Sequence, residues 1–373
     1  MTDTLLLPAK ARSRRRSQQV IRRARPLMGT LVGVTLRGPD AVDLEGLARD
    51  VFAEMHRLES LLSEWSPTSA LALVNDSAGT VPVPVPPELF DVLATARGVA
   101  RATGGAFDPT WAALAPCWPF HQPCFKLPEP AEIDRARALV DHRDIIIDPD
   151  QHTVLLRRPG MSLGLGGAAK AFIAERASDF AVKHGAPDVL IDAGGDVVAR
   201  GCNGTRSWQV GILDPRSPGA LIATLALRDE AVATSGDYRR CIEIAGRRYH
   251  HLLDPRTGWP ANRSCSATVV APGGALADAL ATALFVMGPR GLGIAIASGA
   301  TAAMVVGHDG DVRLASGNPS RKSRHHLGRA HVTTSSAPPP GTTAPAARHA
   351  PGAARRRHAS GQPIRSPGLN RAS

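Results

Sequence analysis

Several features that define specialised protein classes are missing from this sequence. It has five cysteines, none in a Cys-x-x-Cys pair, and their odd number and spacings match no zinc site. We therefore expect free thiols in a reducing compartment. No uninterrupted apolar run reaches the roughly 18 residues that a membrane-spanning helix needs, and the chain has no internal repeat. Neither a disulfide framework nor a transmembrane segment is expected.

Acidic residues are absent from residues 314–373, which carry ten Lys and Arg, and a single acid accompanies the eight basic residues of 1–25. These ends hold net charges of +10 and +7, so the +11 of the whole chain leaves −6 on residues 26–313. The folded body is therefore mildly acidic. This argues against a basic core that binds nucleic acid through its phosphates.

The two basic ends are predicted to be disordered. Residues 316–373 are rich in Pro, Ala and Arg and lack apolar periodicity, so they bury too little surface to offset the entropy of ordering. The sequence thus divides into a disordered basic segment at 1–25, one domain at 26–315 and a disordered basic tail at 316–373. A solvated tail is the simplest interpretation of this composition.

Arg14, Arg15 and Arg16 resemble a twin-arginine export signal, but no apolar stretch of roughly 7–15 residues follows them. We therefore expect a cytoplasmic protein, located peripherally at the inner membrane face if its basic ends contact anionic lipid weakly.

Strand and helix patterns alternate along the body without forming repeated βαβ units. Helical periodicity marks 41–63, 69–75, 88–102, 167–184, 275–287 and 289–298. Alternating or β-branched runs mark 27–37, a hairpin at 144–158, and strands at 188–193, 196–200, 208–213, 221–227, 240–250, 265–271, 301–306 and 311–315. This order predicts an α+β fold with mixed or antiparallel sheets and packed helices.

The apolar helix at 275–287 is interrupted by Asp278 and, four residues later, by Thr282. Residues i and i+4 share a helix face, and oxygen ligands of this kind suit Mg²⁺. The competing interpretation is an acid near a helix start that interacts with the helix dipole.

Three further clusters carry candidate chemistry. Residues 164–170 form a glycine-rich turn that opens the predicted helix at 167–184. Its free backbone N–H groups and the cation of Lys170 suit a phosphate, or the turn serves only packing. Asp108 lies in a Gly-Gly-Ala-Phe-Asp-Pro turn, where it binds a ligand or caps the turn. The adjacent histidines His250 and His251 end a strand and point to opposite faces, so at most one serves as a base.

Taken together, eight motifs in register resemble the ApbE-type FAD:protein FMN transferases, or flavin transferases, over most of 26–315. They lie at 26–30, 62–71 with Asn75, 104–110, 163–170, 193–196, 233–238, 250–258 and 277–282. The resemblance implies an ApbE-like fold and an enzyme that uses Mg²⁺ and FAD. Such an enzyme attaches FMN through a phosphoester to a Thr or Ser hydroxyl of an acceptor flavoprotein and releases AMP.

The resemblance also implies residue roles. Asp278, Thr282 and the Gly167 carbonyl would bind Mg²⁺, and His251 would be the base for the acceptor hydroxyl. Other residues match positions that hold the flavin nucleotide: Met28, Trp65, Ala106, Phe107, Asp108, Gly164, Lys170, Thr234 and Leu253.

One position departs from the family pattern, because Gly164 stands where members usually carry Asp. Losing one such side-chain acceptor typically costs about 1–3 kcal/mol. Two alternatives therefore stay beside the transferase: an FAD pyrophosphatase that gives FMN and AMP, and a flavin-binding protein without turnover. The presence of both His251 and Asp278 favours catalysis over binding alone.

Overall fold

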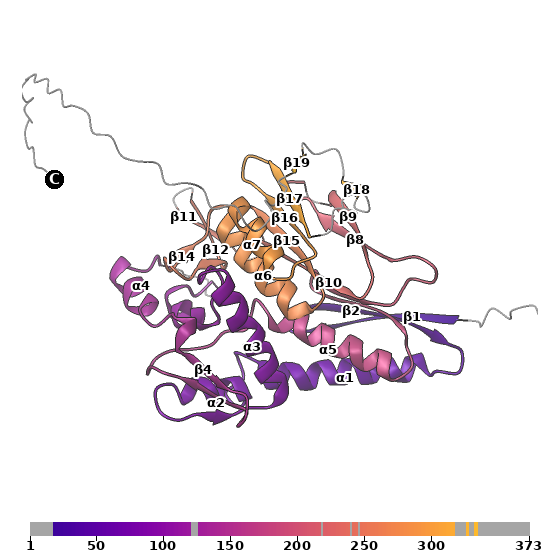
Figure 1. Ribbon diagram of the computed structural model, residues 1–373, viewed down its shortest axis with the longest axis horizontal. Helices are drawn as coiled ribbons and strands as arrows, with labels where there is room; N and C mark the ends of the chain where they lie inside the picture. The colour runs from indigo at the N-terminus through magenta and orange to yellow at the C-terminus, as the bar shows by residue number, and fades with distance from the viewer. Residues whose placement is uncertain are drawn as a thin grey trace, which may run out of the picture. The chain divides into compact units, whose positions relative to one another are not determined.

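The structure is a computed structural model that describes residues 18–120, 126–217, 219–238, 241–244 and 247–317, with the backbone of 326–327 and 332–334 (Figure 1). The chain divides into two units, Met1–Ala337 and Pro338–Ser373, and every described residue belongs to the first. Arg14, Arg15, Arg16 and Cys124, together with most of the two predicted tails, lie outside the described residues.

A large sheet organises the first unit (Figure 1). Among the described residues it has nine strands, each antiparallel to its neighbours except for the parallel pair of β17 and β19. In spatial order they are β1 (Gln18–Leu27), β2 (Thr30–Pro39), β6 (Asp188–Ala193), β7 (Asp196–Arg200), β10 (Glu230–Gly236), β15 (Ser266–Ala271), β16 (Ala302–Val306), β17 (Val312–Ser316) and β19 (Val332–Thr334).

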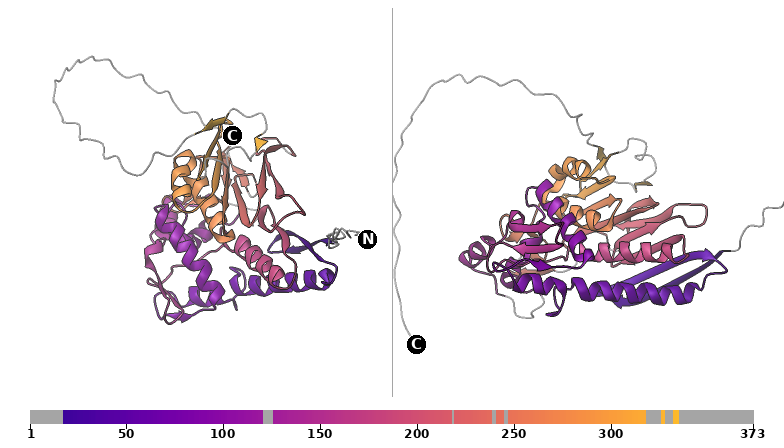
Figure 2. Two further views of the ribbon diagram at one scale, coloured as in Figure 1. Left: turned by 45° about the vertical axis from the view of Figure 1, so that its right-hand side comes forward. Right: turned by 60° about the horizontal axis from the view of Figure 1, so that its bottom comes forward.

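Helices cover one face of this sheet (Figure 2). α1 (Leu44–Leu62) packs on β1 and β2, α5 (Ala169–Lys183) on β6 and β7, and α6 (Gly274–Met287) on β10 and β15. Each helix buries an apolar face, and α1 does so with leucines, Val51 and Met55 at helical spacing. α1 begins where the Asp43 carboxylate accepts the backbone N–H of Gly46 at 2.9 Å, a normal N-cap.

A smaller sheet covers the other face. Its strands are β8 (Trp208–Leu213), β9 (Leu221–Leu227) and β18 (His326–Leu327). Trp208, Ile212 and Leu225 of this sheet pack against Val232 of β10 and Val270 of β15, in an apolar layer separate from the helix side. Strands β10 and β15 therefore lie between two apolar layers, which explains why their residues are buried on both faces.

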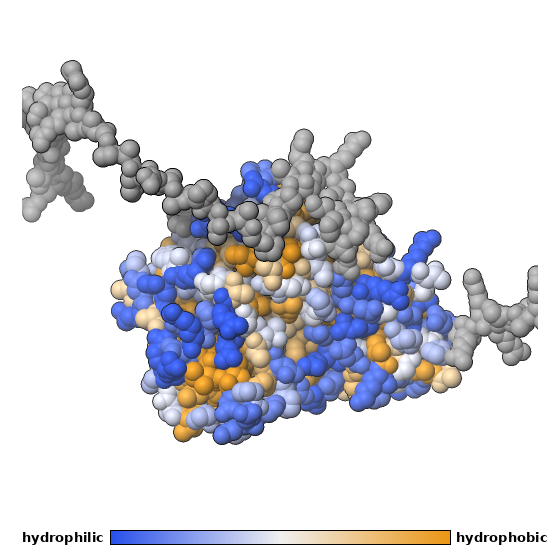
Figure 3. Space-filling model, viewed as in Figure 1, coloured by the Kyte–Doolittle hydropathy of each residue, from blue (hydrophilic) through white to orange (hydrophobic). Residues whose placement is uncertain are grey.

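The remaining elements form two smaller groups (Figure 1). One holds α2 (Ala70–Asp76), α3 (Pro87–Ala102) and the sheet of β3 (Val83–Pro84), β4 (Ile145–Asp148) and β5 (Thr153–Leu156), next to the 3₁₀ turn η2 (His142–Asp144). Figure 3 has an apolar area over α2 and β4, elements that expose Leu73 and Ile146.

The second group surrounds Trp118, whose indole packs against Tyr249 and Trp259. Its elements are the 3₁₀ helix η1 (Pro109–Cys117), α4 (Pro130–Arg137), β11 (Cys241–Ile244), β12 (Arg247–His250), β13 (Leu253–Asp254) and β14 (Trp259–Pro260).

The α+β prediction is confirmed, and the six predicted helices are present with shifted ends. Three differences concern strands and helices. β1 begins at Gln18, inside the segment predicted to be disordered, because Ile21 and Leu27 pack on the core while Arg22, Arg23 and Arg25 stay exposed. β10 and α4 were not predicted, and the predicted strand at 240–250 is two strands, β11 and β12. The tail predicted to be disordered includes the short strands β18 and β19.

Residues 274–297, which combine α6, the turn η3 (Gly288–Gly291) and α7 (Leu292–Ala297), are long and apolar enough to cross a membrane by composition alone. About two thirds of the segment is buried inside the first unit, where α6 packs on the sheet. Its apolar character therefore reflects core packing. The four described cysteines, Cys117, Cys202, Cys241 and Cys265, are free thiols.

Candidate functional site

Asp278 and Thr282 lie one turn apart on α6, and Thr282 contacts the glycine-rich turn that precedes α5. A methyl group at Gly167 would lie 3.0 Å from Thr282 Oγ1, so the two residues are in direct contact. Asp278 is only 5% exposed and is the fifth residue of α6, beyond the first turn. The helix-dipole interpretation is thus disfavoured, because the dipole acts mainly on the first turn.

Two glycine contacts explain why the helices approach so closely. A Cβ atom at Gly274 would lie 2.1 Å from the carbonyl oxygen of Ala171, a distance no side chain permits. The Gly274 N–H donates to the Glu175 carboxylate at 2.7 Å, which fixes the start of α6 on α5. The crossing brings Lys170 of α5 next to Asp278 of α6.

Lys170 lies between two buried carboxylates. Its Nζ is 3.0 Å from Asp196 Oδ2, 3.5 Å from Asp278 Oδ2 and 3.3 Å from the Gly166 carbonyl. Burial lowers the pKa of Lys170, but the charges and hydrogen bonds of both carboxylates outweigh it, and the net pKa lies above the ordinary value. The site therefore holds a permanent cation among oxygen atoms.

The described part of β10 contributes Ser235 to this group. Ser235 Oγ is 3.2 Å from Thr282 Oγ1 and is 8% exposed. The predicted ligand Thr234 is directed to the other face, where its hydroxyl is 2.9 Å from Thr268. Successive residues of a strand alternate between faces, so Ser235 and not Thr234 meets α6.

Glu64 is a further carboxylate beside the glycine-rich turn. Its Oε1 would lie 3.6 Å from a Cβ at Gly166. Burial raises the pKa of Glu64, opposed by the backbone N–H groups of Gly166 and Leu165 and by Lys170. Sequence reasoning missed Asp196, Ser235 and Glu64 as site residues. Each lies inside one of the eight family motifs: Asp196 follows Gly194-Gly195, Ser235 lies between Thr234 and Gly236, and Glu64 precedes Trp65. Their positions in these motifs could have marked them as site candidates.

The predicted flavin residues Ala106, Phe107 and Asp108 are all buried. Phe107 packs against Gly167, since its Cε2 would lie 3.2 Å from a methyl group there. The Asp108 carboxylate accepts the Thr110 N–H and hydroxyl at 2.9 and 2.6 Å, and the His142 N–H at 2.9 Å. Asp108 thus caps its turn, and any ligand contact of its carboxylate would add to these bonds.

Gly164 stands against the indole of Trp111. A Cβ at this position would lie 2.8 Å from Trp111 Nε1, which itself donates to the Gly164 carbonyl at 3.2 Å. The preceding residue, Leu163, exchanges two backbone hydrogen bonds with the Asn75 side chain, at 2.7 and 3.1 Å. Trp111 therefore fills the space that a side chain at 164 would need, and Asn75 fixes the turn.

The two adjacent histidines differ in environment. His250 is 5% exposed, with Nε2 2.8 Å from the Ala261 carbonyl and Nδ1 accepting the Leu252 N–H at 3.3 Å. Both ring nitrogens are occupied, which requires the neutral ring with its proton on Nε2. Burial lowers the pKa of His250. His251 is half-buried at the start of the following loop, so it is the more exposed residue of the pair.

Three other predicted flavin residues lie on separate elements. Met28 forms the turn between β1 and β2 with a positive φ of 53°, and its N–H donates to Glu59 at 2.9 Å. This turn borders an open hollow of about 650 Å³ lined by 26–31, His56 and Glu59. Trp65 is 80% exposed after α1. Leu253 is buried in the cluster around Trp118.

The structure thus brings together Gly167, Lys170, Asp278, Thr282 and Phe107. It adds Asp196, Ser235 and Glu64 to them and directs the Thr234 side chain elsewhere.

This chain is similar to proteins of known name. A relative from Treponema pallidum named FAD:protein FMN transferase is 36% identical over 283 residues, covering 71% of this chain and 78% of its own. A Klebsiella pneumoniae protein of the same name is 33% identical over 264 residues, 70% of this chain and 81% of its own.

Solved structures match as well. An ApbE protein from Thermotoga maritima superposes with a TM-score of 0.75 at 29% identity, covering 82% of this chain and 99% of its own. The flavin transferase ApbE from Vibrio cholerae gives 0.73 at 25% identity, covering 83% of this chain and all of its own. The sequence profile of the ApbE family matches residues 28–315. This chain belongs to the ApbE family.

Proposed function

We propose that this chain is an FAD:protein FMN transferase that transfers FMN from FAD to a Thr or Ser hydroxyl of an acceptor flavoprotein, depends on Mg²⁺ and releases AMP. The names of the relatives and the family membership support the transferase activity. The observation that supports the metal dependence is the position of the Lys170 ammonium. This cation pairs with Asp278 and Asp196, next to the contact between Gly167 and Thr282.

The residues present fit Mg²⁺. Asp278 is a buried carboxylate already paired with a cation, and the Thr282 hydroxyl is one helical turn away. Gly167 lies against Thr282 without a side chain between them, and its carbonyl is assigned as a third oxygen ligand. A few protein oxygens completed by substrate phosphate is the usual magnesium arrangement. When bound, Mg²⁺ supplies charge neutralisation at the reacting phosphoryl group and at the leaving AMP.

The protein groups divide the remaining work. Lys170, whose ammonium lies 3.0 Å from Asp196 and 3.5 Å from Asp278, would neutralise the FAD diphosphate together with the backbone N–H groups at the start of α5. His251 accepts the proton of the acceptor hydroxyl as its oxygen bonds to the FMN phosphorus. The bond from that phosphorus to the bridging oxygen breaks, and AMP leaves with this oxygen. His250 instead orients the loop through its bonds to Ala261 and Leu252.

The flavin nucleotide is assigned to residues on several elements. Phe107 packs beside Gly167, so it lies next to the proposed metal site. Trp65 offers a large exposed ring for stacking. Gly164 has no side-chain acceptor, but the indole of Trp111 fills that space. The further assigned residues are Met28, Ala106, Asp108 and Leu253; Thr234 is not among them, because its side chain lies on the opposite face of β10.

The partners follow from this chemistry. They are FAD and an acceptor flavoprotein with a Thr or Ser attachment site. The −6 charge of residues 26–313 gives no reason to expect specific nucleic-acid binding. We place the enzyme in the cytoplasm, at the inner membrane face when its basic ends contact anionic lipid.

Incubation of the protein with FAD, Mg²⁺ and an acceptor domain tests the proposal. Flavin fluorescence should stay on the denatured acceptor, AMP should appear in equal amount, and His251→Ala should abolish both. His251 is half-buried, so this variant should fold. Free FMN with an unlabelled acceptor would instead identify an FAD pyrophosphatase. Bound but unchanged FAD would identify a non-catalytic flavin-binding protein.

A further inference from the structure

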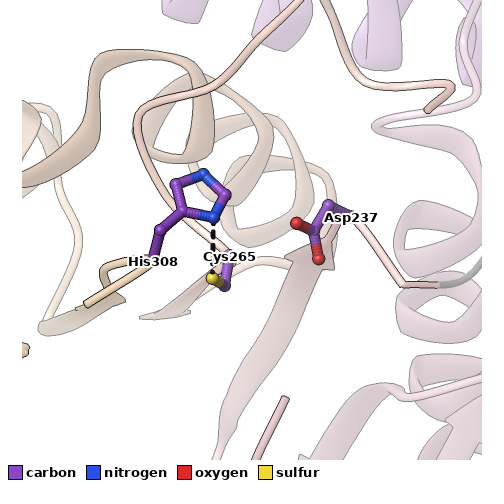
Figure 4. A group of neighbouring side chains, drawn as sticks. All are labelled: Asp237, Cys265 and His308. Carbon is purple, nitrogen blue, oxygen red and sulfur yellow. Dashed lines mark hydrogen bonds between the residues drawn. The ribbon is translucent and has the colours of Figure 1, made fainter. Parts of the chain in front are cut away.

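Three residues with metal-binding side chains meet at one end of the large sheet, outside the proposed magnesium group. They are Asp237, Cys265 and His308 (Figure 4). One ligand atom from each lies within 4.8 Å of the others. Cys265 Sγ is 3.1 Å from His308 Nδ1, and Figure 4 shows the Asp237 carboxylate on the other side of the sulfur.

The sheet register explains why these residues meet. Gly236 of β10 pairs with Ser266 of β15, which pairs in turn with Val306 of β16. Asp237 and Cys265 are the next residues out from this row, and His308 lies two residues beyond Val306. Backbone hydrogen bonds continue the row, from the Asp237 N–H to the Cys265 carbonyl at 3.2 Å and from the Cys265 N–H to the Val306 carbonyl at 2.8 Å. Asp237 and Cys265 are therefore fixed directly beyond the ends of adjacent strands, and His308 lies in the turn that follows β16.

Burial and charge also suit a cation. Asp237 is 7% exposed, Cys265 is half-buried and His308 is exposed. A divalent cation would balance the two negative charges of a thiolate and a carboxylate, and binding would release the thiol proton to solvent.

We propose that Asp237, Cys265 and His308 form a second metal site, selective for Zn²⁺ or a similar transition metal over Mg²⁺. Thiolate and imidazole ligands favour such metals, whereas Mg²⁺ prefers oxygen alone. Zn–S and Zn–N bonds of about 2.3 and 2.0 Å place tetrahedral ligand atoms about 3.5 Å apart, so the observed positions need only small shifts. Three protein ligands leave a fourth position open to solvent beside the exposed His308.

The site would anchor the strand end that leads to the proposed catalytic groups. Asp237 lies two residues after Ser235, the residue that contacts Thr282. It also precedes the β11–β12 hairpin, which ends at His250. A metal bound here would fix the entrance to this hairpin without entering the magnesium group.

Cobalt(II) titration of the whole chain in the presence of Mg²⁺ tests the site. Thiolate-bound Co²⁺ gives a sulfur-to-metal charge-transfer band, which histidines in the tails cannot produce. We expect this band in the wild type, displaced by one equivalent of Zn²⁺, and its loss in Cys265→Ser. His308→Ala should weaken Co²⁺ binding at least 100-fold, since removal of an outer-sphere partner alone costs about 10–100-fold.

Two controls make the result specific. Cys202→Ser removes another half-buried thiol and should keep the band. Asp278→Asn should also keep it, which separates this site from the magnesium group. Because His308 is exposed, its variant should fold even if Cys265→Ser does not. No band in the wild type, or an unchanged band and affinity in His308→Ala, would overturn the proposal.

Discussion

At the scale of single residues, the proposed active site is a set of buried charges that balance one another. Lys170 neutralises Asp196 and Asp278, and no bulky apolar side chain separates Gly167 from Thr282. Removing one member of a buried pair leaves an uncompensated charge and is strongly destabilising. Asp278 is also a proposed ligand of the magnesium ion, so Lys170 and the metal compete for its carboxylate.

Lys170→Met should expose this competition. In EDTA the variant should lose up to about 3 kcal/mol of unfolding free energy, because two buried carboxylates lose their ammonium partner. Mg²⁺ should then raise its melting temperature more than it raises that of the wild type. Lys183→Met, an exposed lysine on the same helix, is the matched control. An equal Mg²⁺ response in all three proteins would show that Lys170 does not occupy the cation position.

The histidine pair predicts a pH effect. Burial lowers the pKa of His250 below its ordinary value of 6.5, so the unfolded chain binds more protons than the folded protein near that pH. The contribution of His250 is present above pH 6.5 and is lost as the pH falls below it, by at most about 1.4 kcal/mol per unit.

Chemical unfolding between pH 5 and 8, a window around the ordinary pKa of His, measures how the unfolding free energy changes with pH. His250→Gln should make the unfolding free energy less dependent on pH, while His251→Gln should lose FMN transfer. The same slope in wild type and His250→Gln would contradict a neutral His250.

The sequence predicted only part of this residue set. Asp278 and Thr282 were found because a carboxylate and a hydroxyl four residues apart are conspicuous in an apolar helix. The sequence pattern could not decide whether Thr234, the predicted residue, or its neighbour Ser235 faces the site. Both neighbours are small and polar, and only the packing of α6 on β10 decides which face meets the site.

At the scale of secondary-structure elements, the crossing of α5 and α6 positions the site. Their helical periodicity was readable, but the contact between them depends on Gly274, whose role appears only when Ala171 is placed beside it. β10 escaped prediction because a strand of mostly small residues buried on both faces lacks the alternating pattern of a half-exposed strand. α4 was missed because its eight residues bury only Ile133.

Gly274→Ala tests the crossing. The added methyl group would meet the Ala171 carbonyl at 2.1 Å and force the helices apart. We expect a loss of about 1–3 kcal/mol in unfolding free energy and weaker Mg²⁺ binding, because Lys170 and Asp278 separate.

Gly293→Ala in α7 is the control, since nothing lies within 4 Å of a Cβ there. It should be neutral or stabilising by up to about 1 kcal/mol. Calorimetry that found the two variants equally stable would contradict the close-contact role of Gly274.

At the scale of the whole molecule, charge is separated along the chain. The body of 26–313 carries −6, while both ends are strongly basic. Composition alone revealed this division, but the boundary near residue 26 was misplaced, because β1 pairs with β2 from Gln18 onward.

Truncation after Ala337 removes six arginines and no acid. The truncated protein should keep FMN transfer and bind anionic vesicles less tightly, with the difference disappearing at high salt. Vesicle sedimentation with and without phosphatidylserine measures this. Undiminished sedimentation of the truncated protein would exclude a membrane role for the C-terminal arginines.

The most direct test of the account is the Mg²⁺ dependence of FAD binding, measured by titration calorimetry in wild type and Asp278→Asn. The substitution keeps the shape of the side chain and removes its charge. We expect Mg²⁺ to tighten FAD binding by the wild type and to have no effect on the variant, which should also lose transfer. Equal Mg²⁺ enhancement in both proteins would contradict a magnesium ion held between α6 and the start of α5.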